Sequence, residues 1–439
     1  MLKQKIFIAC LALPLLVSGC AERARQQTAT NSSQAAEQAS TPSARMTQPV
    51  RVTEEQMDAA EPVLASAKDG TIYLAWVEHH EQGESDLWLA HLSGKGEPLD
   101  QPVRVNPKIG QAMSWRGDPP TLAVADDNTI YLGWTGRIAK EGHASNIYLS
   151  VSHDQGRSFD APLKVNDDER PAGHGLHSLA VGPERRVYMA WLDERSIAAP
   201  PKGAQKSSGH PASMESNREA FFTFSTDGGR SFAPNKRLAD EVCPCCKTSL
   251  ATGPGGRVYV GWRQVLPGDF RHIAVASSSD GGQNFSAPVI VSDDRWAIPA
   301  CPVSGAGLNV AEDGAVRVLW YTAGERGAPG LYWSSSPEGA QKFSERQPFA
   351  GHEPHGTPLL MAVEKNKLIA VWEDDEGAKS NVLMAQMNAD GKATSAAIAE
   401  QGELPSAVVS GNQVFVAYIK KTGERRGIWL TQVQPLASS

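Results

Sequence analysis

The stretches SHDQGRSF (152–159), STDGGRSF (225–232) and SSDGGQNF (278–285) share one pattern, in which Ser, Asp, Gly and Phe occupy equivalent positions. Each stretch follows an alternating run such as NIYLSVS and precedes a short run such as APLKVN, which is the context of a β-hairpin turn. Glycine permits a positive φ at the tip of the turn, and the Asp and Ser side chains satisfy turn amides. Recurrence every few tens of residues predicts a repeat architecture.

A second marker recurs more regularly, namely an apolar strand that follows a polar turn and ends in Trp, as in DGTIYLAW. Its seven copies end at Trp76, Trp134, Trp191, Trp262, Trp320, Trp372 and, with Tyr in place of Trp, Tyr418. Successive copies are 58, 57, 71, 58, 52 and 46 residues apart, which suits four-stranded blades with variable loops. We therefore predict an all-β fold, a β-propeller of seven four-stranded blades, with six blades as the alternative.

The last repeat ends after its third strand, RGIWLTQV, so its fourth strand has to come from elsewhere. The segment TQPVRVTEE (47–55) resembles the outer-strand segment QPVRVNP (101–107). We predict that this N-terminal segment supplies the missing outer strand, closes the ring and removes two sheet edges.

The chain begins with the basic segment MLKQK and an apolar run too short for a stable transmembrane helix. Val17-Ser18-Gly19-Cys20 resembles a bacterial lipobox, which implies a signal peptide over 1–20, a lipid on Cys20 and, because Ala21 follows, outer-membrane sorting. Residues 21–46 contain almost no large apolar side chains and are predicted to be a disordered tether. Residues 47–439 form the single propeller domain, and the predicted membrane partner is the bilayer that receives the lipid.

The formal net charge is −7 and no basic run is present, which argues against nucleic acid or an anionic membrane surface as a partner. Four cysteines remain once Cys10 leaves with the signal peptide and Cys20 carries lipid. In an exported protein, four cysteines indicate disulfide pairing by default.

Because consecutive strands of a blade run antiparallel, the loops fall on two opposite faces. The short turns between the first two strands share a face with the Ser-x-Asp-x-Gly hairpins, so that face is expected to be structural. We call the opposite face the axial face. It collects the residues that enter each inner strand and those that follow each Trp marker, and we expect a small-molecule, glycan or metal ligand, or a protein partner, to bind there.

Soft or borderline metal ligands enter the inner strands of four neighbouring repeats. They are Cys243, Cys245, Cys246, Cys301, His174, His177, His352 and His355. Thiolate and imidazole ligands suit copper or zinc. Two alternatives stay open for the cysteines: a disulfide between Cys301 and one sulfur of the CPCC run, or a redox-active dithiol.

The Ser-x-Asp-x-Gly stretches are Asp boxes, and repeated Asp boxes within a propeller resemble the sialidase, or BNR-repeat, family. The resemblance implies three arginines that hold a sugar carboxylate, a Tyr nucleophile and an Asp that acts as acid and base. By position, the implied residues are Arg116, Arg263 with Arg137 or Arg195, Tyr321, and Asp118 or Asp193. The match departs from the family in two ways, since WRGDPP replaces the Arg-Ile-Pro signature and family sialidases usually have six blades.

These observations predict an outer-membrane-anchored, sialidase-like propeller that binds a ligand at a Cys, His and Arg site on the axial face, with copper or zinc as the candidate metal. The enzyme alternative is an exo-α-sialidase or a related glycoside hydrolase. A protein-docking platform in the cell envelope is the third class of function, because a fold alone does not determine its function.

Overall fold

The computed structural model describes residues 45–138, 144–197, 217–298, 302–350, 354–364, 367–376, 379–387 and 393–434. Pro42–Ser439 form one compact unit, separate from Met1–Thr41. Cys20, the predicted signal peptide, and two of the predicted metal ligands, Cys301 and His352, lie outside the described residues.

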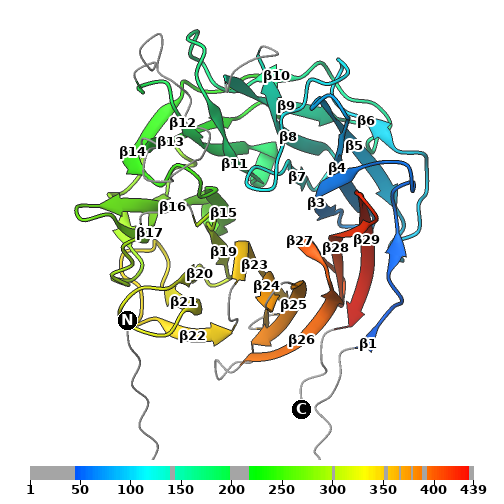
Figure 1. Ribbon diagram of the computed structural model, residues 1–439. Helices are drawn as coiled ribbons and strands as arrows, with labels where there is room; N and C mark the ends of the chain where they lie inside the picture. The colour runs from blue at the N-terminus through cyan, green and yellow to red at the C-terminus, as the bar shows by residue number, and fades with distance from the viewer. Residues whose placement is uncertain are drawn as a thin grey trace, which may run out of the picture. The chain divides into compact units, whose positions relative to one another are not determined.

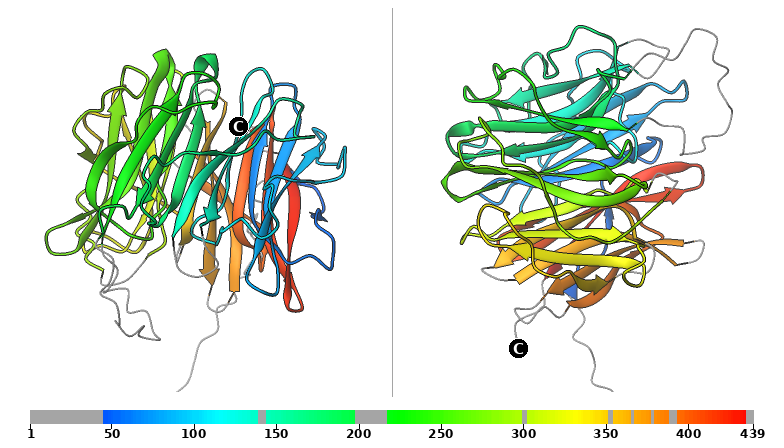
Figure 2. Two further views of the ribbon diagram at one scale, coloured as in Figure 1. Left: turned by 90° about the horizontal axis from the view of Figure 1, so that it is seen from above. Right: turned by 90° about the vertical axis from the view of Figure 1, so that its left-hand side faces the viewer.

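The described part of the chain consists of antiparallel β-strands and short 3-10 turns, without an α-helix. Among these residues, no helix has the length and apolar character needed to cross a membrane. Figure 1 shows the sheets of the Pro42–Ser439 unit arranged side by side around a common centre, and Figure 2 shows their strands running between two opposite faces. The predicted all-β fold is therefore confirmed.

Two four-stranded sheets come from the N-terminal part of the compact unit. In hydrogen-bonded order they are β3 (Ala59–Ser66), β4 (Ile72–His79), β5 (Ser85–Leu92) and β6 (Val103–Arg104), and then β7 (Thr121–Val124), β8 (Ile130–Arg137), β9 (Ser145–Ser152) and β10 (Leu163–Lys164).

The next sheet has eight strands. They are β11 (His174–Val181), β12 (Val187–Asp193), β13 (Arg218–Ser225), β14 (Lys236–Val242), β15 (Ser249–Gly253), β16 (Arg257–Leu266), β17 (Phe270–Ser278) and β18 (Val289–Ile290). Its two halves are joined only where Val242 pairs with Gln264, and β15 pairs with β16 beside that point. A count of seven blades requires that this sheet be divided at the Val242 pairing, so the number of blades stays a prediction.

Three sheets complete the fold. They are β19 (Ala306–Val310), β20 (Val316–Thr322), β21 (Gly330–Ser336) and β22 (Gln347–Ala350); β23 (Pro354–Glu364), β24 (Lys367–Glu376), β25 (Lys379–Met387) and β26 (Ala393–Glu400); and β27 (Glu403–Ser410), β28 (Gln413–Thr422) and β29 (Arg425–Gln434) with β1 (Arg45–Met46) and β2 (Val50–Arg51). Both β1 and β2 pair with β29. The N-terminal segment thus adds the outer strand to the last sheet, as its sequence predicts.

The seven Trp or Tyr markers lie on the second strand of their repeats, and each is at most 1% exposed. Several of the indole N–H groups are held by a side chain at the axial end of the same strand. Trp191 donates to Asp193 at 2.8 Å, Trp262 to Gln264 at 2.7 Å and Trp372 to Asp374 at 3.0 Å. A buried indole needs such a partner, so the polar residue two positions after a marker has a structural role in these repeats.

The Ser-x-Asp-x-Gly hairpins have one hydrogen-bond geometry in all three copies. The Ser hydroxyl accepts the amide of the Gly four residues later, at 2.8 Å for Gly156, 2.9 Å for Gly229 and 2.8 Å for Gly282. Each of these glycines has a φ between 84° and 89°, which a side chain would strain. Hydrogen bonds inside the turn stabilise the charged Asp, and the pKa of Asp227, for example, is lowered to about 2.

These hairpins and the CPCC run lie at opposite ends of the strands. Ser278, which begins one hairpin, pairs with Val258 near the start of β16. The Cys243 amide donates to the carbonyl of Arg263, five residues further along the same strand, at 2.9 Å. At about 3.3 Å per residue the two ends are separated by roughly 16 Å. The CPCC run is therefore on the axial face, where the sequence places it.

Candidate functional site

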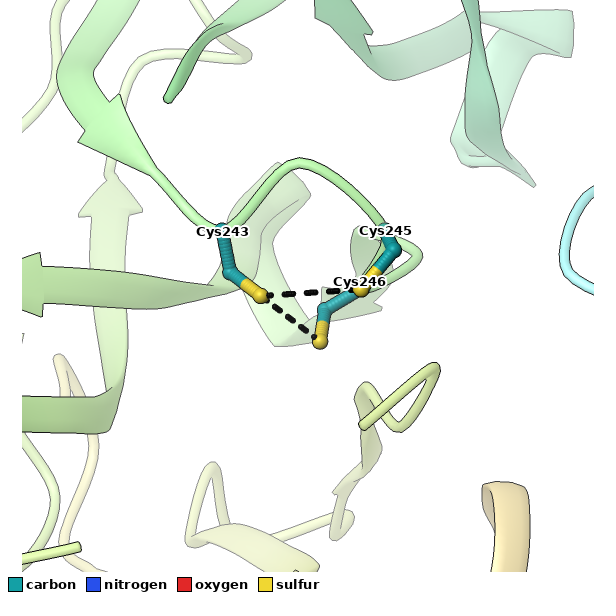
Figure 3. Close-up of side chains that lie close together, drawn as sticks. All are labelled: Cys243, Cys245 and Cys246. Carbon is teal, nitrogen blue, oxygen red and sulfur yellow. Dashed lines mark hydrogen bonds between the residues drawn. The ribbon is translucent and has the colours of Figure 1, made fainter. Parts of the chain in front are cut away.

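The thiol cluster is built on a tight turn between β14 and β15. The Cys246 amide lies 3.5 Å from the carbonyl of Cys243, so the chain reverses within the CPCC run. Pro244 fixes its own φ and has no amide to satisfy inside the turn. The turn therefore projects its cysteine side chains toward one another, as Figure 3 shows.

The three sulfur atoms form a compact group. The Sγ of Cys243 lies 3.1 Å from the Sγ of Cys246 and 3.9 Å from the Sγ of Cys245. Cys243 and Cys246 are 0% exposed, Cys245 is 5% exposed, and all three belong to one buried cluster with Val265. The cluster is thus closed to bulk water.

The cysteines differ in their covalent state. Cys243 and Cys246 carry free thiols, whereas Cys245 is disulfide-bonded. No disulfide joins two cysteines within the described part of the chain, and the predicted pairing of Cys301 with the CPCC run falls outside it. The dithiol of the cluster is therefore the Cys243 and Cys246 pair, in a Cys-x-x-Cys spacing.

The two free thiols differ strongly in acidity. A hydrogen bond from the Cys246 thiol, helped by the positive charges of Arg271 and Arg263, outweighs burial and lowers the pKa of Cys243 to about 6. Burial, the hydrogen bond that it donates to Cys243 and the charge of that sulfur raise the pKa of Cys246 well above its usual value. At neutral pH the pair is a Cys243 thiolate that accepts a hydrogen bond from a Cys246 thiol.

Two buried guanidinium groups flank the dithiol. Arg271 Nη1 donates to the Sγ of Cys243 at 3.1 Å, and its side chain is 7% exposed. Arg263 is 0% exposed. The sequence analysis missed Arg271, although an arginine directly before the alternating run HIAVAS on β17 is the signal that could have identified it, because a charge at a buried strand position requires a partner.

The described histidines do not join the cysteines. His174 is held by the carbonyl of Ser145 and by Asp168, His177 contacts Asp118 at 3.0 Å, and His355 contacts Asp375 at 2.8 Å. Within the described residues, the potential metal-binding group consists of Cys243, Cys245 and Cys246. The mixed thiolate and imidazole site that the sequence suggested is not brought together there.

The carboxylates predicted by analogy with sialidases are already engaged. Asp193 is 0% exposed and accepts from Trp191 and Arg195. Asp118 is 2% exposed and accepts from His177 and Thr135.

The remaining residues of that set are also held apart. Arg116 contacts two other sheets, with Glu373 of β24 at 2.5 Å and Glu403 of β27 at 3.6 Å. Arg263 binds two backbone carbonyls, one of which is that of Tyr321, and the Tyr321 ring packs against Trp296. Each of these residues thus has partners of its own, and the predicted arginine triad stays a prediction.

The sulfur geometry bears on what the dithiol can do. A metal ion 2.3 Å from two sulfurs that are 3.1 Å apart would have an S–metal–S angle of about 85°, smaller than the tetrahedral angle. A disulfide requires the same two sulfurs to approach by about 1 Å, to a bond length of about 2.05 Å. The pair as it stands is therefore closer to disulfide chemistry than to a tetrahedral metal site.

Comparison with known proteins gives a fold and no family. No protein-family model matches the chain, and no curated protein matches its sequence. Among solved structures, a polysaccharide lyase, an ulvan lyase, is similar with a TM-score of 0.55 and 11% identity, over 85% of this chain and 93% of its own.

Two further solved structures are also similar to this chain. A protein of unknown function from Dyadobacter fermentans matches with a TM-score of 0.53 and 17% identity, over 90% of this chain and 100% of its own. The NanB sialidase of Streptococcus pneumoniae matches with a TM-score of 0.48 and 10% identity, over 83% of each chain. At such identities the similarity shows a fold that glycan-processing enzymes share, and it does not carry over an activity.

Proposed function

We propose that the protein is a thiol-dependent redox protein of the cell envelope, a seven-bladed propeller whose axial face holds the Cys243 and Cys246 dithiol. One observation carries the proposal: the buried sulfur of Cys243 lies 3.1 Å from the sulfur of Cys246 and accepts a hydrogen bond from Arg271 at 3.1 Å. Buried structural cysteines normally have raised pKa values and are inert, whereas a pKa lowered by nearby cations is typical of reactive thiols.

The reaction that fits this pair is thiol–disulfide exchange. The Cys243 thiolate attacks one sulfur of an oxidising disulfide, forms a mixed disulfide and releases the other sulfur as a thiol. Cys246 loses its proton and attacks the Cys243 sulfur, which forms the Cys243–Cys246 disulfide and releases the second thiol. Two electrons pass from the dithiol to the external disulfide. Because both sulfurs are buried, the oxidant is expected to be a low-molecular-weight disulfide.

A redox titration tests this proposal. The purified protein is equilibrated in glutathione buffers of graded reduced-to-oxidised ratio, quenched in acid and alkylated, and its free thiols are located by mass spectrometry. We expect Cys243 and Cys246 to lose their reactivity together, as one two-electron couple. Thiols that remain reduced at every ratio would contradict the proposal.

Soft-metal binding is a second candidate, because the free thiols of Cys243 and Cys246 lie 3.1 Å apart and thiolates suit soft metal ions. It differs from the redox proposal in a measurable way. Stoichiometric copper or zinc in the isolated protein, lost when both Cys243 and Cys246 are replaced by Ser, would favour this candidate over the redox couple.

We also propose that Cys20 carries the lipid that anchors the protein in the outer membrane. The support is the Val17-Ser18-Gly19-Cys20 sequence after an apolar run. With Cys20→Ala, we expect the protein to lose incorporation of labelled fatty acid and to leave the membrane fraction. A Cys10→Ala variant is the matched control and should stay in the membrane fraction; labelling of Cys20→Ala at the wild-type level would exclude this anchor.

A further inference from the structure

Arg263 is a fully buried cation, and its hydrogen bonds and ring contact with the described residues all involve uncharged groups. Its Nε donates to the carbonyl of Ser304 at 2.9 Å and its Nη2 to the carbonyl of Tyr321 at 3.1 Å. Its Cζ lies 4.9 Å from the centre of the Trp296 ring. Nη1 is buried and has no hydrogen-bond partner among the described residues. Carbonyls and an aromatic face orient the guanidinium without neutralising its charge.

Burying an unneutralised charge is costly, so such a group requires a counter-ion. Within the described part of the chain Arg263 has no carboxylate within ion-pair distance. Its guanidinium and the Cys246 sulfur both contact the backbone of Ser304, since Arg263 Nε donates to the Ser304 carbonyl at 2.9 Å and the Ser304 amide donates to Cys246. At this position a positive charge favours the thiolate forms of Cys243 and Cys246. Arg271 already donates directly to Cys243, and its Nη2 lies 3.8 Å from the largely exposed Asp269. The pocket therefore holds two buried guanidinium groups and, in the resting dithiol, one thiolate.

We infer that Arg263 is a positioning residue for the second half of the exchange reaction, where it supplies the counter-charge for the thiolate of Cys246. This inference rests on the proposed function and deepens it. Arg271 donates a hydrogen bond to the first thiolate, Cys243, and stabilises its negative charge. When Cys243 enters a mixed disulfide it loses its negative charge, and the unpaired positive charge of Arg263 then stabilises the thiolate that Cys246 has to become.

A two-step chromogenic reaction separates the roles of the two arginines. Dithiodipyridine is a small neutral disulfide that releases one thiopyridone when Cys243 attacks it and a second when Cys246 resolves the mixed disulfide. The protein's two thiols are oxidised to one disulfide and the probe is reduced to two thiopyridones. Stopped-flow absorbance over a range of pH gives the rate and the pH midpoint of each phase.

We expect Arg263→Gln to slow the second phase by about 10- to 100-fold at neutral pH and to raise its midpoint by one to two pH units, as removal of one nearby buried cation does. The rate of the first phase should change by less than about threefold, because Arg271 still donates its hydrogen bond to Cys243. Cys246→Ser is the control that removes the second phase completely.

Arg263→Lys keeps a charge in the pocket and covers the case in which Arg263→Gln does not fold, as judged by thermal unfolding. We expect its second phase to stay within about threefold of wild type. Two results would overturn the inference. One is a folded Arg263→Gln protein whose second phase has the wild-type rate, and the other is a folded Arg263→Lys protein that lacks the second phase. A wild-type protein without any second phase would instead refute the proposed redox function, so the two failures are distinguishable.

Discussion

Cys243→Ser is expected to abolish the reaction of the site with oxidised glutathione at neutral pH, whereas Cys246→Ser should trap a stable mixed disulfide between Cys243 and glutathione. The asymmetry follows from the acidities of the two thiols. With a pKa of about 6, Cys243 is mostly thiolate at pH 7, and the thiolate is the nucleophile. Burial and the hydrogen bond with Cys243 raise the pKa of Cys246 well above its usual value, so the Cys246 thiol stays protonated at that pH.

Serine is the appropriate replacement at position 246 because its hydroxyl can still donate a hydrogen bond to the Cys243 thiolate. In Cys246→Ser, the rate of glutathione adduct formation should therefore rise with pH with a midpoint near 6. At neutral pH this rate should be at least about tenfold higher than the rate at which Cys243→Ser forms any adduct. Intact-mass spectrometry after an acid quench counts the bound glutathione. Equal adduct formation by the two variants would show that the site does not distinguish an attacking from a resolving sulfur.

The strands of this fold were predictable because they depend on short-range patterns. Each Trp marker combines a polar turn with an alternating strand, so Trp134 or Trp372 identifies its own repeat without reference to any other part of the chain. The N-terminal addition to the last sheet was also predictable, since the outer-strand segment occurs twice and one repeat lacks it. The blade count was not settled in the same way, because Val242 and Gln264 connect two repeats into one continuous sheet.

The contacts of the candidate site were much less predictable. Arg116 and Glu373 are 257 residues apart in sequence and 2.5 Å apart in space. Nothing near either residue in the sequence indicates the other, so an arginine predicted to hold a substrate is an anchor between sheets. Arg271 and the CPCC run meet for the same reason, through the pairing of β16 with β17. Residue type and face could be read from the sequence, but the partner of each charge depends on how the repeats pack.

Asp118→Ala is expected to lower the free energy of unfolding by about 3 to 5 kcal/mol, the usual cost of breaking a buried charge pair. The carboxylate is 2% exposed and accepts hydrogen bonds from Thr135 at 2.6 Å and from His177 Nδ1 at 3.0 Å. The charge of Lys247, from a third repeat, also acts on it. Its removal would leave these groups without an anion at the place where three repeats meet.

Asp126→Ala is the matched control. Asp126 contacts Lys68 at 2.8 Å, but both side chains are more than 70% exposed. Exposed pairs of this kind contribute about 0 to 1 kcal/mol. Denaturant unfolding of the two variants and wild type, with equal m-values, gives the comparison; similar losses for Asp118→Ala and Asp126→Ala would contradict a special role for the buried carboxylate.

The pH dependence identifies the Asp118 effect as electrostatic. Burial alone would raise the pKa of Asp118, but His177, Lys247 and Thr135 together hold it below its usual value of 3.8. A carboxyl group with a lowered pKa in the folded state stabilises the fold above its unfolded pKa, and this contribution disappears as the pH falls through the folded pKa. The difference between wild type and Asp118→Ala should therefore shrink below about pH 4.

The difference should also shrink in alkali. Burial lowers the pKa of Lys247 to about 8, against the opposing influence of Asp118, so above that pH the lysine is neutral and no longer needs a counter-charge. The stability gap is then largest just above about pH 5, declines as the pH approaches 8, and is smaller above pH 8. A gap that stayed constant from pH 3 to pH 9 would mean that Asp118 only fills space. Because the two thiols lie in a separate hydrogen-bonded group, their two-phase reaction should persist in the folded Asp118→Ala protein.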